Sequence, residues 1–525
     1  MSAVTAPAET SALQAALRDP MPTDRLVGWT VTLGLTALAF VVRVIGLGYP
    51  DKLVFDETYY PKDAWSLLHF GYEREWPADA NERVVAGETM IMGDGPAFVV
   101  HPPLGKWLIA GGEALFGMTS FGWRFSACVF GALLVLITIR LVRRITRSTL
   151  LGGAAGVLLT FDGLAFVMSR IGLLDGFQAF FLVAGVSALV ADRDWFRTRL
   201  ADHLLARGLP DLGGLAGPLV LWRPWRVLAG VMFGMACGVK WSSLYVVAAF
   251  GLLSVAWDVG ARRLAGASRR SLLGLLVDGI PAFVSVVVLG ALVYLSTWAG
   301  WLATQGGYYR DWGRSNPEST SVQLLGAPLA SLLHYHSQMY GFHTGDFINN
   351  QSHGYDADPI GWLVLARTIG IDAVNNIEPG VDGCPLDVDR CQRVITGIGT
   401  PLLWWVGAAC LVVAVVWWLM RRDWRFGVPV VGVASTWLPW FQYTDRPTFL
   451  FYAVTIIPFT VLAVCLLIGL AMGPPDAPRR RVATMVSAVF VALVVVNFIY
   501  FHPVWTDALL SYREWAARMW LRTWI

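Results

Sequence analysis

Charged side chains are scarce in this chain. Only 15% of its 525 residues are Asp, Glu, Lys or Arg, and 56% are hydrophobic, whereas roughly a quarter of a soluble domain is charged. No long basic run occurs outside short loops, which argues against binding of nucleic acid. The sequence also shows no internal repeat of the kind found in many transporters. These shortages predict an all-α integral membrane protein that crosses the lipid bilayer several times.

Cysteine is scarce as well. Cys384 and Cys391 share a polar loop and could form a disulfide if that loop faces an oxidising compartment. The first 24 residues are a Pro/Ala/Thr-rich tail with no evident cleavable signal, so we expect the first apolar segment to be an uncleaved anchor. The remaining four cysteines fall within apolar segments and are interpreted as small core residues: Cys128, Cys237, Cys410 and Cys465.

Eleven apolar stretches are long enough, or nearly long enough, to span a bilayer as helices. They lie at 27–48, 121–140, 149–168, 173–191, 226–239, 241–257, 272–298, 401–420, 426–440, 448–472 and 482–501. A twelfth candidate at 103–118 is short and Gly-rich, and it carries Lys106 and Glu113. Hydropathy alone does not decide whether this last segment crosses the membrane.

The positions of the arginines decide how these stretches are oriented. Half of the forty Lys and Arg residues lie in five short loops, at 140–147, 193–226, 262–270, 421–425 and 479–481, and such loops usually face the cytoplasm. Eleven spans with a cytoplasmic tail at 1–26 place all five loops inside, provided that 103–118 lies flat on the outer surface. We therefore predict about eleven transmembrane helices in a domain at 27–501, with an interfacial helix in the first outer loop.

This topology places two large acidic loops outside, at 49–120 and 299–400. Between 49 and 102 there are ten Asp and Glu against four Lys and Arg, and between 301 and 400 there are ten against five. The segment 502–525 also ends outside and is predicted to be an amphipathic, Trp-rich interfacial tail. The acidic outer face and the basic inner face support the same orientation.

Polar residues that a membrane helix normally avoids lie at the outer ends of the spans. The adjacent carboxylates Asp56 and Glu57 follow the first span, where a low-dielectric boundary makes two neighbouring charges costly. Lys240 lies in a turn between two unusually short spans, which suggests a turn below the surface in a water-filled cavity. The other members are His101, Lys106, Arg124, Arg170, Asp175, Asp445 and Arg446. Cations that hold a phosphate beside a carboxylate that accepts a proton suit chemistry on a lipid-linked phosphate.

Simpler interpretations apply to several of these residues. Arg124, Arg170 and Lys240 could each extend toward lipid headgroups, and we favour Arg170 and Asp175 as a structural pair over a catalytic role. Asp-x-Asp patterns occur at 192–194, 356–358 and 387–389, but the first lies among arginines and the others in loops rich in acid. The histidines of the second outer loop complete no zinc pattern. No metal site is predicted.

The motifs, in their order, resemble those of the protein O-mannosyltransferases. The resemblance covers nearly the whole chain and rests on these stretches: Phe55-Asp56-Glu57-Thr58-Tyr59-Tyr60, His101-Pro102-Pro103-Leu104-Gly105-Lys106, Arg124, Ser169-Arg170-Ile171-Gly172-Leu173-Leu174-Asp175, Val239-Lys240-Trp241 and Phe449-Leu450-Phe451-Tyr452. It implies a metal-independent, inverting GT-C membrane glycosyltransferase with its active site away from the cytoplasm. Because 299–400 is too short for a MIR domain, the chain resembles the compact bacterial, actinobacterial form.

The resemblance implies transfer of mannose from polyprenyl-phosphate-mannose to Ser or Thr hydroxyls, at the plasma membrane, on proteins emerging from the Sec translocon. Asp56 would be the general base, although an ordinary Asp pKa of about 3.9 suits an alcohol poorly, and Glu57 would orient the acceptor or Asp56. Arg124 and Lys240 would hold the donor phosphate, with Lys106 and His101 as weaker candidates. The lipid-linked donor is a substrate, and no cofactor is expected.

Two other functions remain open from the sequence. A GT-C enzyme of this kind could move another lipid-linked sugar, such as aminoarabinose or arabinofuranose, onto a glycolipid or polysaccharide. A flippase or transporter of lipid-linked sugars would instead place polar residues at mid-bilayer on both sides of the midplane, whereas here they gather at the outer ends.

Overall fold

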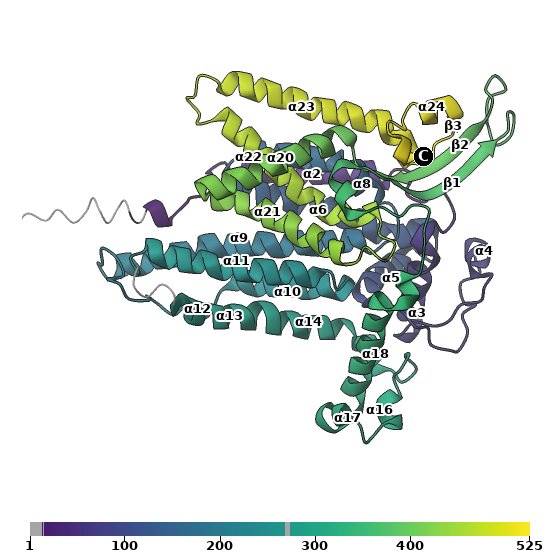
Figure 1. The fold of residues 1–525 in the computed structure, drawn as a ribbon, viewed down its shortest axis with the longest axis horizontal. Helices are drawn as coiled ribbons and strands as arrows, with labels where there is room; N and C mark the ends of the chain where they lie inside the picture. The colour runs from purple at the N-terminus through teal and green to yellow at the C-terminus, as the bar shows by residue number, and fades with distance from the viewer. Residues whose placement is uncertain (1–12, 14, 268–272) are drawn as a thin grey trace, which may run out of the picture.

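The computed structural model describes residues 13, 15–267 and 273–525, and the chain is mostly helical. The long helices run side by side, and the segments predicted to lie outside gather at one end of them (Figure 1). Of the predicted regions, part of the tail at 1–26, part of the loop at 262–270 and residue 272 lie outside the described residues.

Each predicted span contains a helix. Within the described residues, seven helices are long and apolar enough to cross a membrane, so the protein is a multi-pass membrane protein, while the number eleven stays a prediction. Six of the seven are α2 (Arg25–Val44), α6 (Ser120–Thr146), α9 (Asp175–Ala206), α11 (Ser243–Leu264), α20 (Pro401–Arg421) and α23 (Arg480–Phe501). The seventh joins α12 (Gly274–Val277), α13 (Gly279–Ala282), the π-helical η3 (Phe283–Val288) and α14 (Leu289–Thr297).

The remaining predicted spans form shorter helices. These elements are α7 (Thr149–Thr160), α8 (Gly163–Val167), α10 (Pro224–Val239), α21 (Trp424–Trp437), η5 (Leu438–Gln442), η6 (Leu450–Thr455) and α22 (Ile457–Met472). Three of them, α10, η5 and α22, have a proline in the first turn, where the missing N–H has no helical partner to lose.

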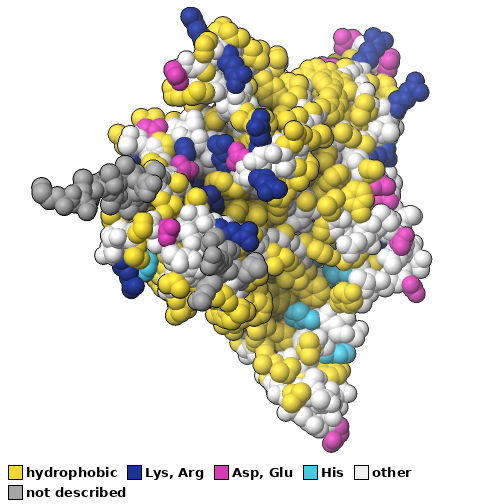
Figure 2. Space-filling model, turned by 60° about the vertical axis from the view of Figure 1, so that its left-hand side comes forward, with side chains coloured by type: hydrophobic (Ala, Val, Ile, Leu, Met, Phe, Trp, Pro, Cys, Tyr) yellow, Lys and Arg dark blue, Asp and Glu magenta, His cyan; other side chains and the backbone are white. Residues whose placement is uncertain are grey.

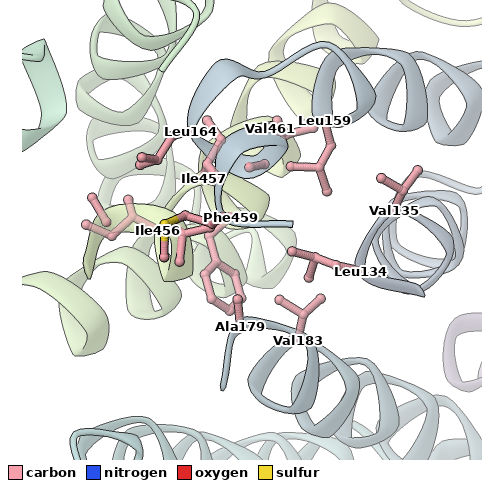
Figure 3. Packing of buried hydrophobic residues seen from close by; sticks show 14 of the residues in the cluster. Leu134, Val135, Leu159, Leu164, Ala179, Val183, Ile456, Ile457, Phe459 and Val461 are labelled. Carbon is pink, nitrogen blue, oxygen red and sulfur yellow. The ribbon is translucent and has the colours of Figure 1, made fainter. Parts of the chain in front are cut away.

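Aliphatic side chains from helices far apart in the sequence form the core. Figure 3 shows Leu134 and Val135 of α6 with Val183 of α9 and Ile457 and Phe459 of α22 in one buried cluster. Glycine permits α9 and α10 to approach closely, since a Cβ at Gly185 of α9 would lie 2.4 Å from the Phe233 ring of α10. This packing fixes α9 and α10, whose outer ends carry two of the predicted site residues.

The arginine-rich segments meet one another away from the outer loops. Arg144 and Arg147 both pair with Asp194 of α9, and Arg193 lies over the ring of Trp424, at 3.5 Å from its centroid. Figure 2 shows a broad hydrophobic surface between two regions that carry charged side chains. This arrangement is what a bilayer requires of a spanning protein.

The first outer loop is built mainly of short helices. They are η1 (Phe55–Thr58), α3 (Tyr60–Phe70), α4 (Ala80–Val85) and α5 (Leu104–Phe116). The predicted interfacial segment 103–118 is the helix α5, and it buries Lys106 and Glu113 against neighbouring protein. Its flat position on a membrane stays a prediction.

The second outer loop contains a feature that the sequence reading missed, a small antiparallel sheet. Its strands are β1 (Ile369–Ile377), β2 (Cys391–Gly397) and β3 (Leu510–Ser511), in the order β1-β2-β3. Cys384 and Cys391 form a disulfide within this hairpin. The helices of this loop are α15 (Ala299–Ala303), α16 (Trp312–Ser315), α17 (Thr320–Leu325), α18 (Ala327–Thr344), α19 (Asp346–Asn349) and η4 (Pro359–Val364).

The C-terminal tail packs on this sheet. Besides β3 it comprises η7 (His502–Trp505), α24 (Tyr512–Ala516) and η8 (Arg522–Trp524). Trp505 and Trp524 are buried in protein, and the Trp524 indole N–H donates to the carbonyl of Leu365. The tail has four tryptophans, which were expected to lie at a membrane interface. These two instead pack inside the protein and stabilise the fold.

Candidate functional site

A strained turn presents the first carboxylate, Asp56. Phe55, which precedes it, has φ of +48°, a backbone conformation that residues other than glycine adopt at a cost of roughly 1–2 kcal/mol. The Phe55 ring packs edge-on against His353, Phe449 and Phe451. These ring contacts hold the turn that directs Asp56 away from Glu57.

Asp56 is largely buried and weakly bonded. The Tyr60 hydroxyl donates to it at 3.4 Å. Burial raises the Asp56 pKa to about 6, the negative charge of Asp175 adds to the rise, and the positive charge of Lys240 opposes it. A pKa of about 6 keeps the group ionised at neutral pH and makes it a stronger base than an ordinary aspartate.

Glu57, one residue later, is fully enclosed and fully bonded. Arg124 donates to both of its oxygens at 2.8 Å, and the backbone N–H groups of Gly172 and Val54 donate to one oxygen each at 2.7 and 3.1 Å. Glu57 therefore ties the turn to α6 and to the segment before α9. These four bonds use the acceptor positions of the carboxylate, so none is left for an acceptor hydroxyl.

The hydrogen-bond donors of Arg124 are all used within the same turn. Besides Glu57 it donates to the carbonyls of Leu47, Pro50 and Lys52, so each of its five N–H groups has a partner. The expectation that Arg124 holds the donor phosphate conflicts with these bonds. We reassign it to positioning the turn.

Lys240 lies where the sequence predicted, in the turn after α10, but its partner is unexpected. Its ammonium contacts both oxygens of Asp175 at 2.9 and 2.7 Å and lies 5.2 Å from the centroid of the Tyr452 ring. Arg170 instead donates to three backbone carbonyls around the end of α2. The expected Arg170–Asp175 pair is therefore wrong, because Lys240 occupies Asp175.

The two weaker phosphate candidates differ from each other. Lys106 is buried and pairs with Glu73, with Asp63 4.0 Å away, so its charge is already compensated by carboxylates. His101 lines the cavity described next, and burial together with nearby cations lowers its pKa well below the usual value. A neutral His101 can exchange hydrogen bonds there but supplies no positive charge.

A cavity of about 400 Å³ lies beside Lys240. His101, His343, Tyr452 and Arg446 line it with Lys240. Arg446 is the residue that the sequence reading noted in its turn but did not place in the site. Its Nη1 lies 3.4 Å from Nδ1 of His343, and its buried Nε has no hydrogen-bond partner among the described residues.

An apolar groove of about 560 Å³ adjoins this cavity. Trp241, Leu244 and Tyr340 line both spaces, and the groove continues along α10, α11 and η3. Its outer rim includes Leu244 and Val287, which are 57% and 42% exposed and open it toward the hydrophobic surface. One site thus combines a charged pocket with a long apolar extension.

The described residues offer no group of three or more His, Cys, Asp and Glu side chains that could hold a metal ion. The outer-loop histidines instead pack against aromatic rings. His334 stacks on Trp312 with ring centroids 4.3 Å apart, and His336 stacks on Trp241 at 5.5 Å. These residues shape the walls of the loop and the groove.

The fold is that of the GT-C membrane glycosyltransferases. The structure superimposes on the Saccharomyces cerevisiae protein O-mannosyltransferase Pmt1–Pmt2 complex bound to the sugar donor, with a TM-score of 0.69 at 14% sequence identity, covering 99% of this chain and 95% of that chain. At this identity the likeness concerns the fold.

Sequence comparison identifies the family within this class. The family model described as dolichyl-phosphate-mannose-protein mannosyltransferase matches residues 33–201, and the C-terminal four-helix region of protein O-mannosyltransferases matches 328–524. A polyprenol-phosphate-mannose–protein mannosyltransferase of Mycobacterium tuberculosis is 38% identical over 96% of this chain and 93% of that protein. One of Corynebacterium glutamicum is 33% identical over 93% of this chain and 92% of that protein. The chain belongs to the protein O-mannosyltransferase family, which confirms the resemblance.

Proposed function

We propose that this protein transfers mannose from polyprenyl-phosphate-mannose to Ser or Thr hydroxyls of polypeptides, with inversion at the sugar carbon. The observation that carries the proposal is Asp56, a carboxylate with a raised pKa whose neighbour Lys240 lines a cavity shared with Arg446. A base and a phosphate site in adjacent positions are what this reaction needs. The names of the relatives support the choice of donor.

In the proposed step the acceptor hydroxyl oxygen attacks the anomeric carbon of mannose. The bond between that carbon and the phosphate oxygen breaks, the phosphate leaves with the electron pair, and the hydroxyl proton passes to Asp56. Lys240 and Arg446 stabilise the charge that develops on the leaving phosphate. Arg446 carries this role in place of Arg124, because its Nε is unpartnered whereas Arg124 is saturated.

The polyprenyl chain of the donor would lie in the apolar groove. The groove shares three wall residues with the charged cavity, so a phosphate beside Lys240 leaves its lipid tail between α10, α11 and η3. The groove is apolar and opens toward the hydrophobic surface, so a chain that lies there keeps an apolar environment like that of the bilayer. This fit supports a lipid-linked donor over a soluble nucleotide sugar.

The orientation in the membrane is part of the proposal. Arginine-rich loops at one end and the acidic loops with the cavity at the other support a cytoplasmic N-terminus and a site on the outer side of the membrane. The proposal also assigns the protein to the plasma membrane, with acceptors that arrive from the Sec translocon. The acceptor is then an unfolded or emerging polypeptide whose hydroxyl reaches Asp56.

The test replaces the proposed base. Asp56→Asn should lower mannosyl transfer from labelled polyprenyl-phosphate-mannose to a Thr-rich peptide by roughly 10²–10⁴-fold, the usual contribution of a general base. Asp79→Asn, an exposed carboxylate of the same loop with a side chain 66% exposed, is the matched control and should retain full transfer. Near wild-type transfer by Asp56→Asn would exclude the base assignment, and transfer from a different lipid-linked sugar instead of mannose would exclude the donor.

A further inference from the structure

A second cavity lies away from Lys240, between the sheet and the C-terminal tail. It has a volume of about 340 Å³, within the lower part of the range of small-ligand pockets. One wall is the face of β2 formed by the alternate residues Gln392, Val394 and Thr396. Tyr512 and Trp515 of the tail also line it.

An unpaired hydrogen-bond donor lies at the wall of this cavity. Gln392 lines the cavity and is 5% exposed, and its enclosed side-chain Nε2 has no partner among the described residues. Buried amides in folded proteins almost always have a partner, which is protein, water or a ligand. The amide of a lining residue therefore keeps a donor that the protein itself leaves unused.

Among the side chains that line the cavity, that of Asp372 is charged, and Arg390 and Arg367 lie outside the lining. Arg390 donates to Asn376 and lies over the Tyr512 ring, while Arg367 donates to backbone carbonyls, including that of Gly354. Asp372 is held in an ion pair with Lys52 at 2.7 Å. With these charges compensated, the cavity offers neutral amide and hydroxyl groups beside aromatic faces.

This combination matches the surface of a sugar ring. A hexose presents C–H faces that pack on aromatic rings such as Trp515 and hydroxyl groups that pair with amides and hydroxyls such as those of Gln392 and Thr396. A polypeptide strand would instead need unpaired backbone groups at a sheet edge, whereas this cavity lies on a sheet face.

The cavity is also connected to the proposed active site. Tyr355 lines it, and the Tyr355 ring packs against His353, which contacts Phe55 and Phe449 beside Asp56. We propose that the sheet–tail cavity binds a mannosyl residue already attached to the acceptor polypeptide. This inference rests on the proposed function, and it makes a mannosylated product a preferred substrate for the next transfer.

The experiment compares two synthetic Thr-rich peptides of one sequence, one of them carrying a single α-mannosyl threonine. Their dissociation constants are measured by fluorescence anisotropy on full-length protein that carries Asp56→Asn, without lipid donor, so that no transfer occurs. The mannosylated peptide should bind about tenfold more tightly. Trp515→Ala should remove most of this advantage and Gln392→Leu about fivefold of it, the usual worth of one hydrogen bond.

Two features keep the test decisive. Gln392→Leu removes an unpartnered buried amide, so its unfolding temperature should stay at or above that of the parent protein. Trp520 is an exposed tail residue outside the cavity lining, so Trp520→Ala should leave the binding of both peptides unchanged. Equal binding of the two peptides, an unchanged advantage in both cavity variants, or an equal loss for both peptides would each overturn the proposal. None of these outcomes depends on Asp56, so failure of the base assignment would appear separately, in the transfer assay.

Discussion

Two buried clusters at opposite ends of α10 each contain two carboxylates and two cations. The inner one consists of Asp192, Arg223, Arg226 and Asp258, all at most 2% exposed. Six hydrogen bonds join them, and every carboxylate oxygen accepts at least one. A 16-residue helix separates this cluster from the outer one by about 24 Å.

The outer cluster has the same charges but is left incomplete. Lys240 and Asp175 pair closely, whereas Asp56 accepts a single long bond from Tyr60. Each cluster keeps one unpartnered arginine nitrogen, Nη1 of Arg226 in the inner one and Nε of Arg446 in the outer one, but Arg446 lines a cavity. The same residue types therefore have different roles at the two ends of α10. A cluster with its acceptors satisfied joins helices, and a cluster with groups left over beside a cavity is prepared for a ligand.

Breaking the inner cluster should have the largest effect on stability. Asp258→Ala leaves two buried guanidinium groups short of a carboxylate, so the free energy of unfolding should fall by about 3–5 kcal/mol. Denaturation of the purified protein in detergent measures this. Asp202→Ala, which breaks an exposed pair with Arg18, is the control and should cost less than about 1 kcal/mol; equal losses in the two variants would contradict a structural role for the cluster.

A substitution in the outer cluster should affect binding of the donor. Arg446→Gln removes charged hydrogen bonds worth about 1.5–3 kcal/mol, so the KM for polyprenyl-phosphate-mannose should rise roughly tenfold to a hundredfold with little change in thermal unfolding. Arg124→Gln should instead lower the unfolding temperature, because it leaves Glu57 buried without its main partner. A donor KM that is unchanged in Arg446→Gln would remove Arg446 from the phosphate site.

The pH dependence gives the smallest and most graded effect. Asp56 must be ionised to accept a proton, and burial raises its pKa to about 6. Transfer should therefore be constant above about pH 7, half-maximal near pH 6 and fall about tenfold per unit below it. A profile of kcat/KM for the acceptor peptide that stays flat down to pH 5 would show that Asp56 is not the titrating base.

Much of the fold could be predicted from the sequence, because long apolar runs leave few alternatives to helices in a membrane. The sheet could not, since β1 contains Gly370, Asp372 and two asparagines, which are poor strand residues, and β3 comes from a distant part of the chain. These strands form through tertiary contacts with each other and with the tail.

The site was predictable in place but not in detail. The outer turns indicated Asp56 and Lys240, since charged residues at span ends are easy to recognise. Asp56 and Glu57 differ in their hydrogen bonding because Glu57 accepts bonds from Arg124 and Gly172, which lie 67 and 115 residues from it in the sequence. Arg446 was noted among the outer-end residues but was not assigned a role, because only the folded chain shows that it lines the cavity with Lys240.

The open rim of the apolar groove has a consequence for supply of the donor. A polyprenyl tail that enters between Leu244 and Val287 never has to leave the bilayer, so encounter becomes a search in two dimensions. The rate at low substrate then depends on the number of donor molecules per unit area of membrane, and the spent polyprenyl phosphate returns to the same pool by the same path.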